Sequence, residues 1–218
     1  MRKLILYAII LCMFLLKSCQ GDDYVYPSVL TEFIDAQTDG SGTLTHLIGD
    51  DGTAYRIQAR DGLGGLTADS LYRSVSIYEP LMENAGNENL VKLYQCQLIL
   101  APVPVFPATF KDGVKTDPAD IQRIWRSGNY INMVLEVKVR DEKHTYYFID
   151  EGIKQERNQQ ILNIRFYHDS KNDYEAYTHK AYLSIPLSTY QDKLKKGDKI
   201  RFFINTYKDG VIQKELEY

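Results

Sequence analysis

The chain has 218 residues, 44% of them hydrophobic and 25% charged, which is enough for one large or two small domains that each bury a core. Its 26 Lys and Arg against 29 Asp and Glu give a net charge of −3 at pH 7. This mildly acidic balance argues against generic nucleic-acid binding, which needs basic patches that neutralise phosphates.

The N-terminal residues have the pattern of a bacterial secretion signal. Arg2 and Lys3 form a basic start, and the apolar run 4–16 is shorter than the roughly 20 residues that a membrane-spanning helix needs. The sequence Leu16-Lys17-Ser18-Cys19 resembles a lipobox, although its lysine departs from the usual small or apolar residue. We therefore expect a signal peptide over residues 1–18 and lipidation of Cys19. An unlipidated leader or a plain membrane anchor is the alternative.

Residues 19–28 are polar and are typical of a tether. Gln20 is not the Asp that retains lipoproteins in the inner membrane, and Gly21-Asp22-Asp23 resembles the acidic tether of lipoproteins that face the cell exterior. We therefore expect lipid anchoring to the outer membrane, with the protein facing outward. Each buried CH₂ contributes roughly 0.8 kcal/mol, so two or three acyl chains make desorption negligible. Loss of the leader removes three basic residues, leaving 23 against 29 acidic ones, a net charge near −6.

The segment 29–107 has short β-branched and aromatic runs separated by Gly, Asp and Asn, a pattern that predicts an OB-like β-barrel. The expected strands are 29–37, 43–48, 53–58, 73–79 and 90–100. Gly49-Asp50-Asp51-Gly52 predicts a hairpin turn, because glycine supplies the positive φ that such turns need. The proline-rich run 101–107 then predicts a connector, since proline cannot donate a sheet hydrogen bond.

The segment 108–218 is predicted to be an antiparallel β-sandwich. Asp117 and Pro118 are typical of a helix start, and Ile121, Ile124 and Trp125 would share one face of that short helix. Residues 130–140 alternate apolar and polar side chains, which predicts a strand with one face on a core and the other largely wet. The further expected strands are 144–149, 160–168, 177–185, 199–207 and 211–216. The fold class expected for the whole chain is therefore all-β.

One stretch of this second segment resembles a known family. Asp117-Pro118 followed by Ile124-Trp125-Arg126-Ser127-Gly128-Asn129-Tyr130-Ile131-Asn132 resembles the start of the C-terminal domain of NigD-like lipoproteins. The runs 162–169 and 181–187 match later parts of the same pattern. The resemblance covers essentially the whole chain and implies an OB-like N-terminal domain, a C-terminal β-sandwich and membrane anchoring. It implies no catalytic residues, because the family has no established activity.

The cysteines and histidines do not form a recognisable site. Cys96 lies in a predicted strand without a partner, because Cys12 leaves with the leader and Cys19 carries lipid, so we expect it to act as a small hydrophobe. The four histidines lie on predicted strands without the close spacing of zinc ligands, although two of them, His144 and His168, can meet across neighbouring strands. The oxygen-rich loop 169–175 lacks the glycine and terminal glutamate of a calcium loop. No metal or cofactor site is expected.

Catalytic motifs are also lacking. The sequence has no G-x-S-x-G element, and Gly62-Leu63-Gly64-Gly65 lacks the Lys-Ser or Lys-Thr of a phosphate-binding loop. Asp150-Glu151 is the adjacent carboxylate pair to inspect for glycoside hydrolysis, although loop acids are usually solvated. Tyrosine is abundant, and Tyr146, Tyr147, Tyr174 and Tyr177 are candidate ligand-facing aromatics, although β-sheets also favour tyrosine for packing.

These features favour a non-enzymatic lipoprotein that binds or scaffolds at the cell envelope, with an envelope protein or a glycan as its partner. One alternative is an envelope hydrolase acting on glycans or peptides, which would need a cleft with two carboxylates at catalytic separation. The other is a structural subunit of a larger surface assembly. A concave face between the domains would support the first hypothesis.

Overall fold

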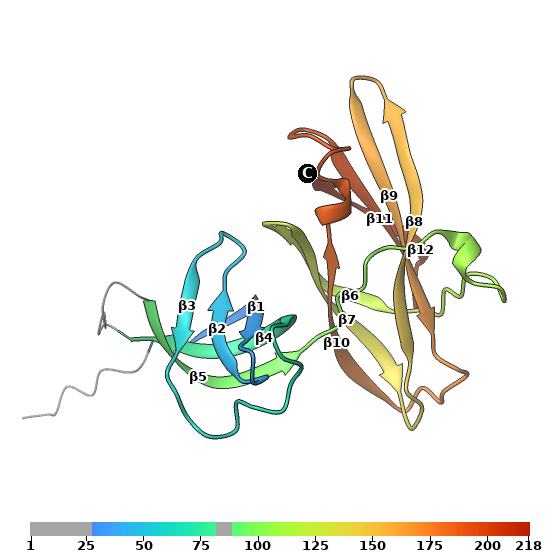
Figure 1. The fold of residues 1–218 in the computed structure, drawn as a ribbon. Coiled ribbons are helices and arrows are strands. Elements are labelled where there is room, and N and C mark those ends of the chain that lie inside the picture. Colours follow the sequence, from blue (N-terminus) through green and yellow to red (C-terminus); the bar gives the residue numbers. More distant parts are fainter. Residues whose placement is uncertain (1–27, 82–88) are drawn as a thin grey trace, which may run out of the picture.

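The computed structural model describes residues 28–81 and 89–218, which form a small barrel followed by a larger sandwich (Figure 1). The expected signal peptide 1–18, Cys19 and the tether up to residue 27 lie outside the described residues. Within the described ranges no helix has the length and apolar character needed to cross a bilayer. The expected all-β fold class, barrel first and sandwich second, is confirmed.

The barrel closes in the order β1-β2-β3-β5-β4. Its strands are β1 (Leu30–Thr38), β2 (Leu44–Ile48), β3 (Ala54–Ile57), β4 (Leu71–Pro80) and β5 (Asn89–Leu98). The β3–β5 pair is parallel and the other neighbours are antiparallel. These strands differ from the expected ones only at their ends. A barrel of five short strands is what the sequence predicts for this segment.

The barrel core is small and built from alternate residues of each strand. Ile34 and Ala36 point inward from β1 and pack with Leu47, Tyr78 and Val91, all at most 1% exposed. The turn between β2 and β3 has Gly52 at φ +85, as the sequence predicts, and its end is closed by a hydrogen bond from Gly49 N to Thr53 O. This turn projects from the barrel toward the sandwich.

The sandwich has a three-stranded sheet, in the order β10-β7-β6, over a four-stranded sheet, in the order β12-β11-β9-β8. The strands are β6 (Asp120–Ser127), β7 (Tyr130–Val139), β8 (Thr145–Glu156), β9 (Gln159–Asp169), β10 (Tyr177–Pro186), β11 (Lys199–Thr206) and β12 (Gly210–Glu217). Two 3₁₀ turns, η2 (Pro107–Thr109) and η3 (Ser188–Tyr190), complete the described elements. The β9–β11 pair is parallel, whereas the other neighbours are antiparallel.

The predicted helix beginning at Asp117 is wrong, because residues 120–127 form strand β6. A β-bulge between Ile121 and Arg123 inserts one extra residue, so Ile121 and Ile124 reach the sandwich core from the same face although they are three positions apart. Such spacing imitates a helix. The Asp117 carboxylate does not cap a helix but accepts hydrogen bonds from the backbone N (2.7 Å) and Oγ (2.6 Å) of Ser170.

Strand β7 has the expected alternation, but its second face is not uniformly wet. Ile131, Met133, Leu135 and Val137 are fully buried in the sandwich core. Asn132, on the opposite face, is also fully buried, because the barrel packs there. The expected solvent face of this strand is therefore partly a contact between the two domains.

The connector 101–107 is fastened to the sandwich near both of its ends. Ser184 N of β10 donates to Leu100 O at 3.0 Å. Val105 N donates to Phe148 O at 2.9 Å, and Asp150 N donates back to Val105 O at 2.8 Å, both in β8. The connector therefore touches one strand of each sheet before the chain enters the sandwich.

Candidate functional site

The tight turn between β6 and β7 brings the sandwich against the barrel. Gly128 lies in this turn at φ +51, a left-handed conformation that glycine adopts without steric cost. Any side chain at this position would overlap the backbone carbonyl of Asp50 in the β2–β3 turn. The joint between the domains is thus a contact between two turns, and it needs a glycine on the sandwich side.

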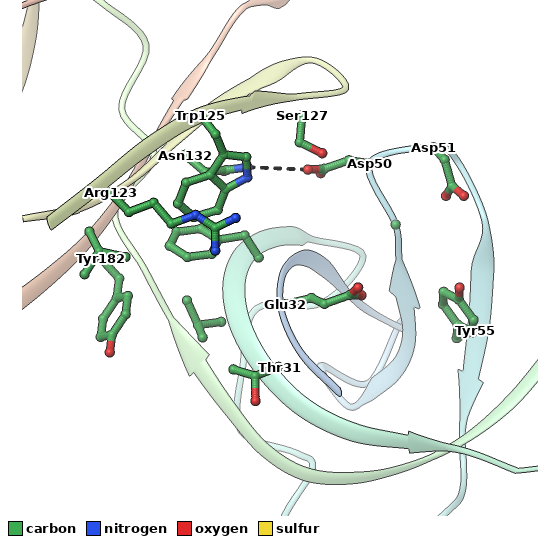
Figure 2. A pocket seen from close by; sticks show the side chains of 14 residues that line it. Thr31, Glu32, Asp50, Asp51, Tyr55, Arg123, Trp125, Ser127, Asn132 and Tyr182 are labelled. Carbon is green, nitrogen blue, oxygen red and sulfur yellow. Dashed lines mark hydrogen bonds between the residues drawn. The ribbon is translucent and has the colours of Figure 1, made fainter. Parts of the chain in front are cut away.

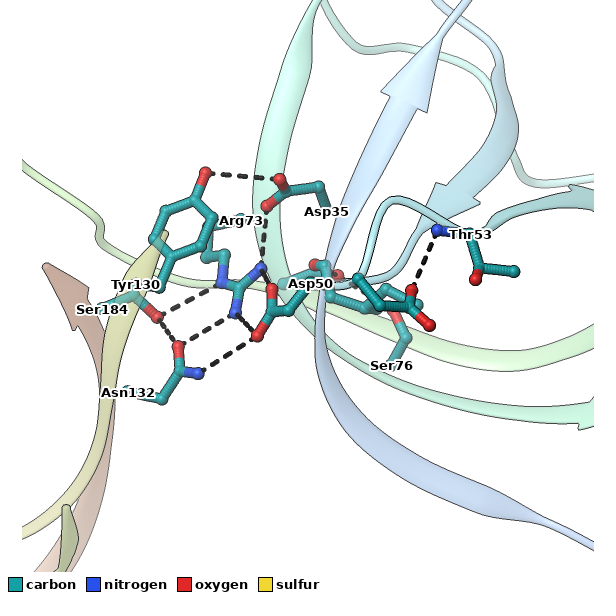
Figure 3. A network of polar contacts seen from close by, with 11 residues as sticks. Asp35, Asp50, Thr53, Arg73, Ser76, Tyr130, Asn132 and Ser184 are labelled. Atoms are coloured by element: carbon teal, nitrogen blue, oxygen red, sulfur yellow. Dashed lines mark hydrogen bonds and ion pairs between the residues drawn. The ribbon is translucent and has the colours of Figure 1, made fainter. Parts of the chain in front are cut away.

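Beside this contact, Arg73 of β4 reaches from the barrel into the sandwich (Figure 3). Its Nη1 donates to Asp35 (3.0 Å) and Asp50 (2.7 Å), and its Nη2 donates to Asp50 (3.0 Å) and Asn132 (3.0 Å). Its Nε donates to Ser184 Oγ at 3.4 Å. All five guanidinium N–H groups therefore have acceptors, three on barrel residues and two on sandwich residues. We call these five residues, with Tyr130, the interdomain latch.

Tyr130 completes the interdomain latch from the first residue of β7. The Arg73 guanidinium lies over its ring, 3.9 Å from the centroid, and its hydroxyl donates to Asp35 Oδ2 at 3.3 Å. Burial raises the pKa of both Asp35 and Tyr130, although the bonds and charge of Arg73 oppose the shift at Asp35. Because Arg73 is only 5% exposed, loss of one partner would leave a buried charge without compensation.

The joint borders a cleft of about 590 Å³ between barrel and sandwich (Figure 2). The barrel contributes β1, β3, β4 and the β2–β3 turn, and the sandwich contributes β6, β7 and β10. The concave face between the domains that the sequence analysis associates with a binding protein is therefore present.

The two walls of the cleft differ in chemistry. Glu32 and Asp51 present carboxylates from the barrel, whereas the sandwich presents Trp125 with the Arg123 guanidinium 4.4 Å from its ring centroid. Phe33 of β1 meets Trp125 edge to face at 5.0 Å. The barrel wall thus carries these two carboxylates, whereas the sandwich wall carries a cation stacked on an aromatic ring.

The carboxylates of the barrel wall are held by neutral donors. Tyr78 OH donates to Glu32 at 2.5 Å, and Thr53 N donates to Asp51 at 2.9 Å. The bonds from Thr53 hold the pKa of Asp51 below its usual value. Among residues 28–81 and 89–218, neither Glu32 nor Asp51 takes part in an ion pair.

The four candidate tyrosines do not form one surface, and none lines the cleft. Tyr146 packs against the sandwich core beside Phe166, and burial raises its pKa to about 12. Tyr147, next along β8, is on the opposite face. Tyr174 and Tyr177 are 69% and 57% exposed near the end of β7. A ligand-facing role for these residues stays a prediction.

His144, directly before β8, meets His168 of β9, as the sequence predicts. His144 Nδ1 lies 2.9 Å from His168 Nε2, and its Nε2 lies 3.3 Å from Asp173. Burial opposes ionisation of Asp173, but backbone N–H groups including those of Arg140 and Asp141 outweigh it and hold the pKa at about 2. Within the described part of the chain, no three His, Cys, Asp or Glu residues are arranged to hold a metal ion.

The other residues singled out from the sequence have structural contacts. Asp150 accepts from Gly152 N (2.8 Å) and Tyr190 OH (2.9 Å), and Glu151 pairs with Arg165 at 2.5 Å. Cys96 is half-buried and packs against the barrel core. The side chains that build the joint and cleft, Arg73 above all, are distant in sequence. The signal that pointed to them was the segment 124–132, which supplies Trp125, Gly128 and Asn132.

Comparison with known proteins agrees with this architecture. Residues 101–218 match the model of the NigD-like C-terminal beta sandwich domain. A NigD-like immunity protein from Bacteroides caccae, whose crystal structure is known, has 33% sequence identity to this chain. The structural match has a TM-score of 0.72 and covers 88% of this chain and 94% of the other.

More distant structures share the fold alone. A protein of unknown function from Bacteroides vulgatus and a candidate lipoprotein from Bacteroides fragilis are each 15% identical and cover 88% of this chain, with TM-scores of 0.69 and 0.62. They are covered over 91% and 98% of their own lengths, respectively. The search of curated proteins gave no match.

Proposed function

The chain belongs to the NigD-like family, and from this premise we propose that it is a lipid-anchored, non-catalytic binding protein of the bacterial envelope. Its binding site is the cleft between barrel and sandwich. The observation that carries this proposal is the interdomain latch at the side of the cleft, which fixes one domain against the other before any partner arrives.

The geometry supports binding in two ways. The cleft volume of about 590 Å³ is in the range of ligand sites, which are about 300–1,000 Å³. A site whose walls are already positioned loses less conformational entropy on binding than one that must be ordered by its partner. The buried Arg73 network gives the cleft that positioning.

We propose that the partner is a protein. The 33% identical neighbour is named an immunity protein, and immunity proteins of the colicin type act by tight binding to a protein toxin. A glycan is the competing partner, because aromatic and polar side chains also line glycan-binding sites. The cross-linking experiment below distinguishes the two by the chemical nature of the adduct.

The site is tested by photo-cross-linking in intact cells. A photoreactive amino acid replaces Thr31, an exposed residue on the cleft wall, or Thr178, an exposed residue of β10 outside the cleft. We expect a protein adduct from position 31 that is missing from position 178. Identical adducts from both positions, or none from position 31, would contradict binding in the cleft.

Anchoring through Cys19, with the protein facing outward from the outer membrane, belongs to the same proposal. Labelled palmitate should incorporate into the wild type but not into Cys19→Ala, and the variant should be found in the medium or periplasm. Protease added to intact cells should degrade the wild type if it faces outward. Failure of the wild type to incorporate palmitate would overturn the anchor while leaving the cleft untouched.

A further inference from the structure

The charges in the cleft identify the kind of group that it binds. We propose that the cleft receives a basic side chain, lysine or arginine, of the partner polypeptide, with Glu32 and Asp51 as its anionic contacts. This inference rests on the proposed function and narrows it from a cleft that binds a protein to one that binds a cationic segment.

The first step is the balance of charge on the cleft walls. Arg73 is surrounded by Asp35 and Asp50, so its charge is already matched within the interdomain latch. Arg123 is the cation on the opposite wall, where it stacks on Trp125. Glu32 and Asp51 have only neutral donors among the described residues, so the cleft carries an excess of negative charge.

The second step is the state of these carboxylates. Tyr78 OH uses Glu32 Oε2, and Thr53 N uses Asp51 Oδ1, so each carboxylate keeps an oxygen without a hydrogen bond from the described chain. A carboxylate with a free oxygen can accept N–H groups from an ammonium or a guanidinium. Such charge-assisted bonds are stronger than bonds between neutral groups.

The third step is the aromatic side chains of the cleft, which leave no open ring face for a sugar on the sandwich wall and place one ring beside the carboxylates. Trp125 is half-buried, the Arg123 guanidinium already stacks on its ring, and Phe33 meets the ring at an interplanar angle of 87°. The indole is therefore not an open platform for a sugar ring. The ring of Tyr55, which lines the barrel wall together with the two carboxylates, is electron-rich and favours a positive group.

The experiment uses Trp125 as an internal reporter. It is the one tryptophan of the chain and it lines the cleft, so its fluorescence, excited where tyrosine does not absorb, reports on this site. The probe is the tripeptide Gly-Arg-Gly blocked at both ends, and its neutral counterpart carries citrulline in place of arginine. A neutral glucose oligosaccharide serves as the glycan probe.

We expect the arginine peptide to change Trp125 fluorescence in a saturable way. The double variant Glu32→Gln, Asp51→Asn should bind it about tenfold more weakly or worse, since charge-assisted bonds are replaced by neutral ones. Both amides retain an oxygen for Tyr78 OH and Thr53 N, so the melting temperature should be unchanged. The matched control, Asp192→Asn with Glu217→Gln, neutralises two exposed acids of the sandwich and should bind like the wild type.

The other outcomes separate this inference from the proposed function. If the citrulline peptide binds as tightly as the arginine peptide, or the double variant binds as tightly as the wild type, the inference that a basic side chain is bound is overturned. The proposal that the cleft binds a peptide would then still stand. A response to the oligosaccharide with none to either peptide would overturn it in favour of a glycan. No response to any probe, together with loss of the cross-link at position 31, would overturn both proposals.

Discussion

Two of the buried polar networks among the described residues differ in the parts of the chain that they join. The interdomain latch joins residues far apart in sequence, since Arg73 bonds to Asn132 and Ser184 at separations of 59 and 111 positions. The network of His144, His168 and Asp173 closes within the sandwich, over separations of 24 and 29 positions. The first fixes one domain against another, and the second fixes a strand pair and its neighbouring loops.

This difference indicates which of the two networks shapes the cleft. The latch contains a buried cation with two carboxylates, and its sandwich residues come from the same face that lines the cleft. The histidine network lies among side chains of one domain and borders no part of the cleft. Breaking the latch should therefore alter the domain arrangement, whereas breaking the histidine network should alter stability alone.

The largest effect is expected from Arg73→Met. The substitution leaves Asp35 and Asp50 facing each other without their cation, and removing one partner of a buried ion pair typically costs about 3–5 kcal/mol. The free energy of unfolding, measured by chemical denaturation, should fall by that amount, and Trp125 fluorescence should report a changed cleft. Arg60→Met, at an exposed barrel position, should change stability by less than about 0.5 kcal/mol. Similar losses in both variants would contradict the role of the latch.

Gly128→Ala should have the next largest effect, about 2–4 kcal/mol. A residue other than glycine at positive φ costs about 1–3 kcal/mol, and the overlap with the Asp50 carbonyl adds to this. Gly210→Ala is the matched control, because Gly210 also has a positive φ, +67, but no atom within 4 Å of the added methyl group. The difference between the two losses, measured by chemical denaturation, isolates the contact between the turns. Equal losses would show that the barrel moves aside without cost.

The histidine network should appear as a pH dependence of stability. Burial lowers the pKa of His168, so below about pH 6.5 the unfolded chain takes up a proton that the folded chain does not. The free energy of unfolding should therefore fall as the pH drops from 6.5 toward the lower folded value, by at most about 1.4 kcal/mol per pH unit. Asp173, with a pKa of about 2, stays charged across this window.

His168→Gln should flatten this slope, whereas His179→Gln, at an exposed position of β10, should leave it unchanged. Denaturation curves between pH 8 and pH 5 measure both. Trp125 fluorescence of the native state should not follow this pH change, because the network lies outside the cleft. A slope that survives in His168→Gln would assign it to other groups.

The smallest effect is expected from Tyr130→Phe. This change keeps the ring under Arg73 but removes the hydroxyl that donates to Asp35, which should cost about 0.5–1.5 kcal/mol. Tyr94→Phe removes the hydroxyl bound to Glu79 at the protein surface and should cost less. Chemical denaturation of both variants gives the comparison. Equal losses in the two variants would indicate that the hydrogen bond from Tyr130 to Asp35 adds no more stability than a surface hydrogen bond.

The sequence predicted what depends on local pattern. Alternation located the barrel strands and the core face of β7, Gly52 located a turn, and strand adjacency brought His144 to His168. The same reasoning gave a wrong helix near Ile121, because one inserted residue in a β-bulge gives the apolar residues of a strand the spacing typical of a helix.

The site itself could not be predicted, because it is assembled from both domains. Nothing in the pattern around Arg73 indicates that the ends of two distant strands supply its acceptors. Asn132 lies on the face of β7 where the alternation places polar side chains. That face is buried at Asn132 only because the barrel packs against it. The family resemblance marked the segment 124–132, and the structure places that segment at the joint and in part of the cleft wall.

The connector between the domains has a consequence for self-association. Strands β10 and β8 are edge strands of their sheets, and exposed edges invite pairing with another chain. The connector occupies backbone groups of both edges through Leu100 and Val105, and its prolines cannot donate hydrogen bonds to an incoming strand. The segment that joins the domains therefore also shields one side of the sandwich from edge-to-edge pairing with a second copy of the chain.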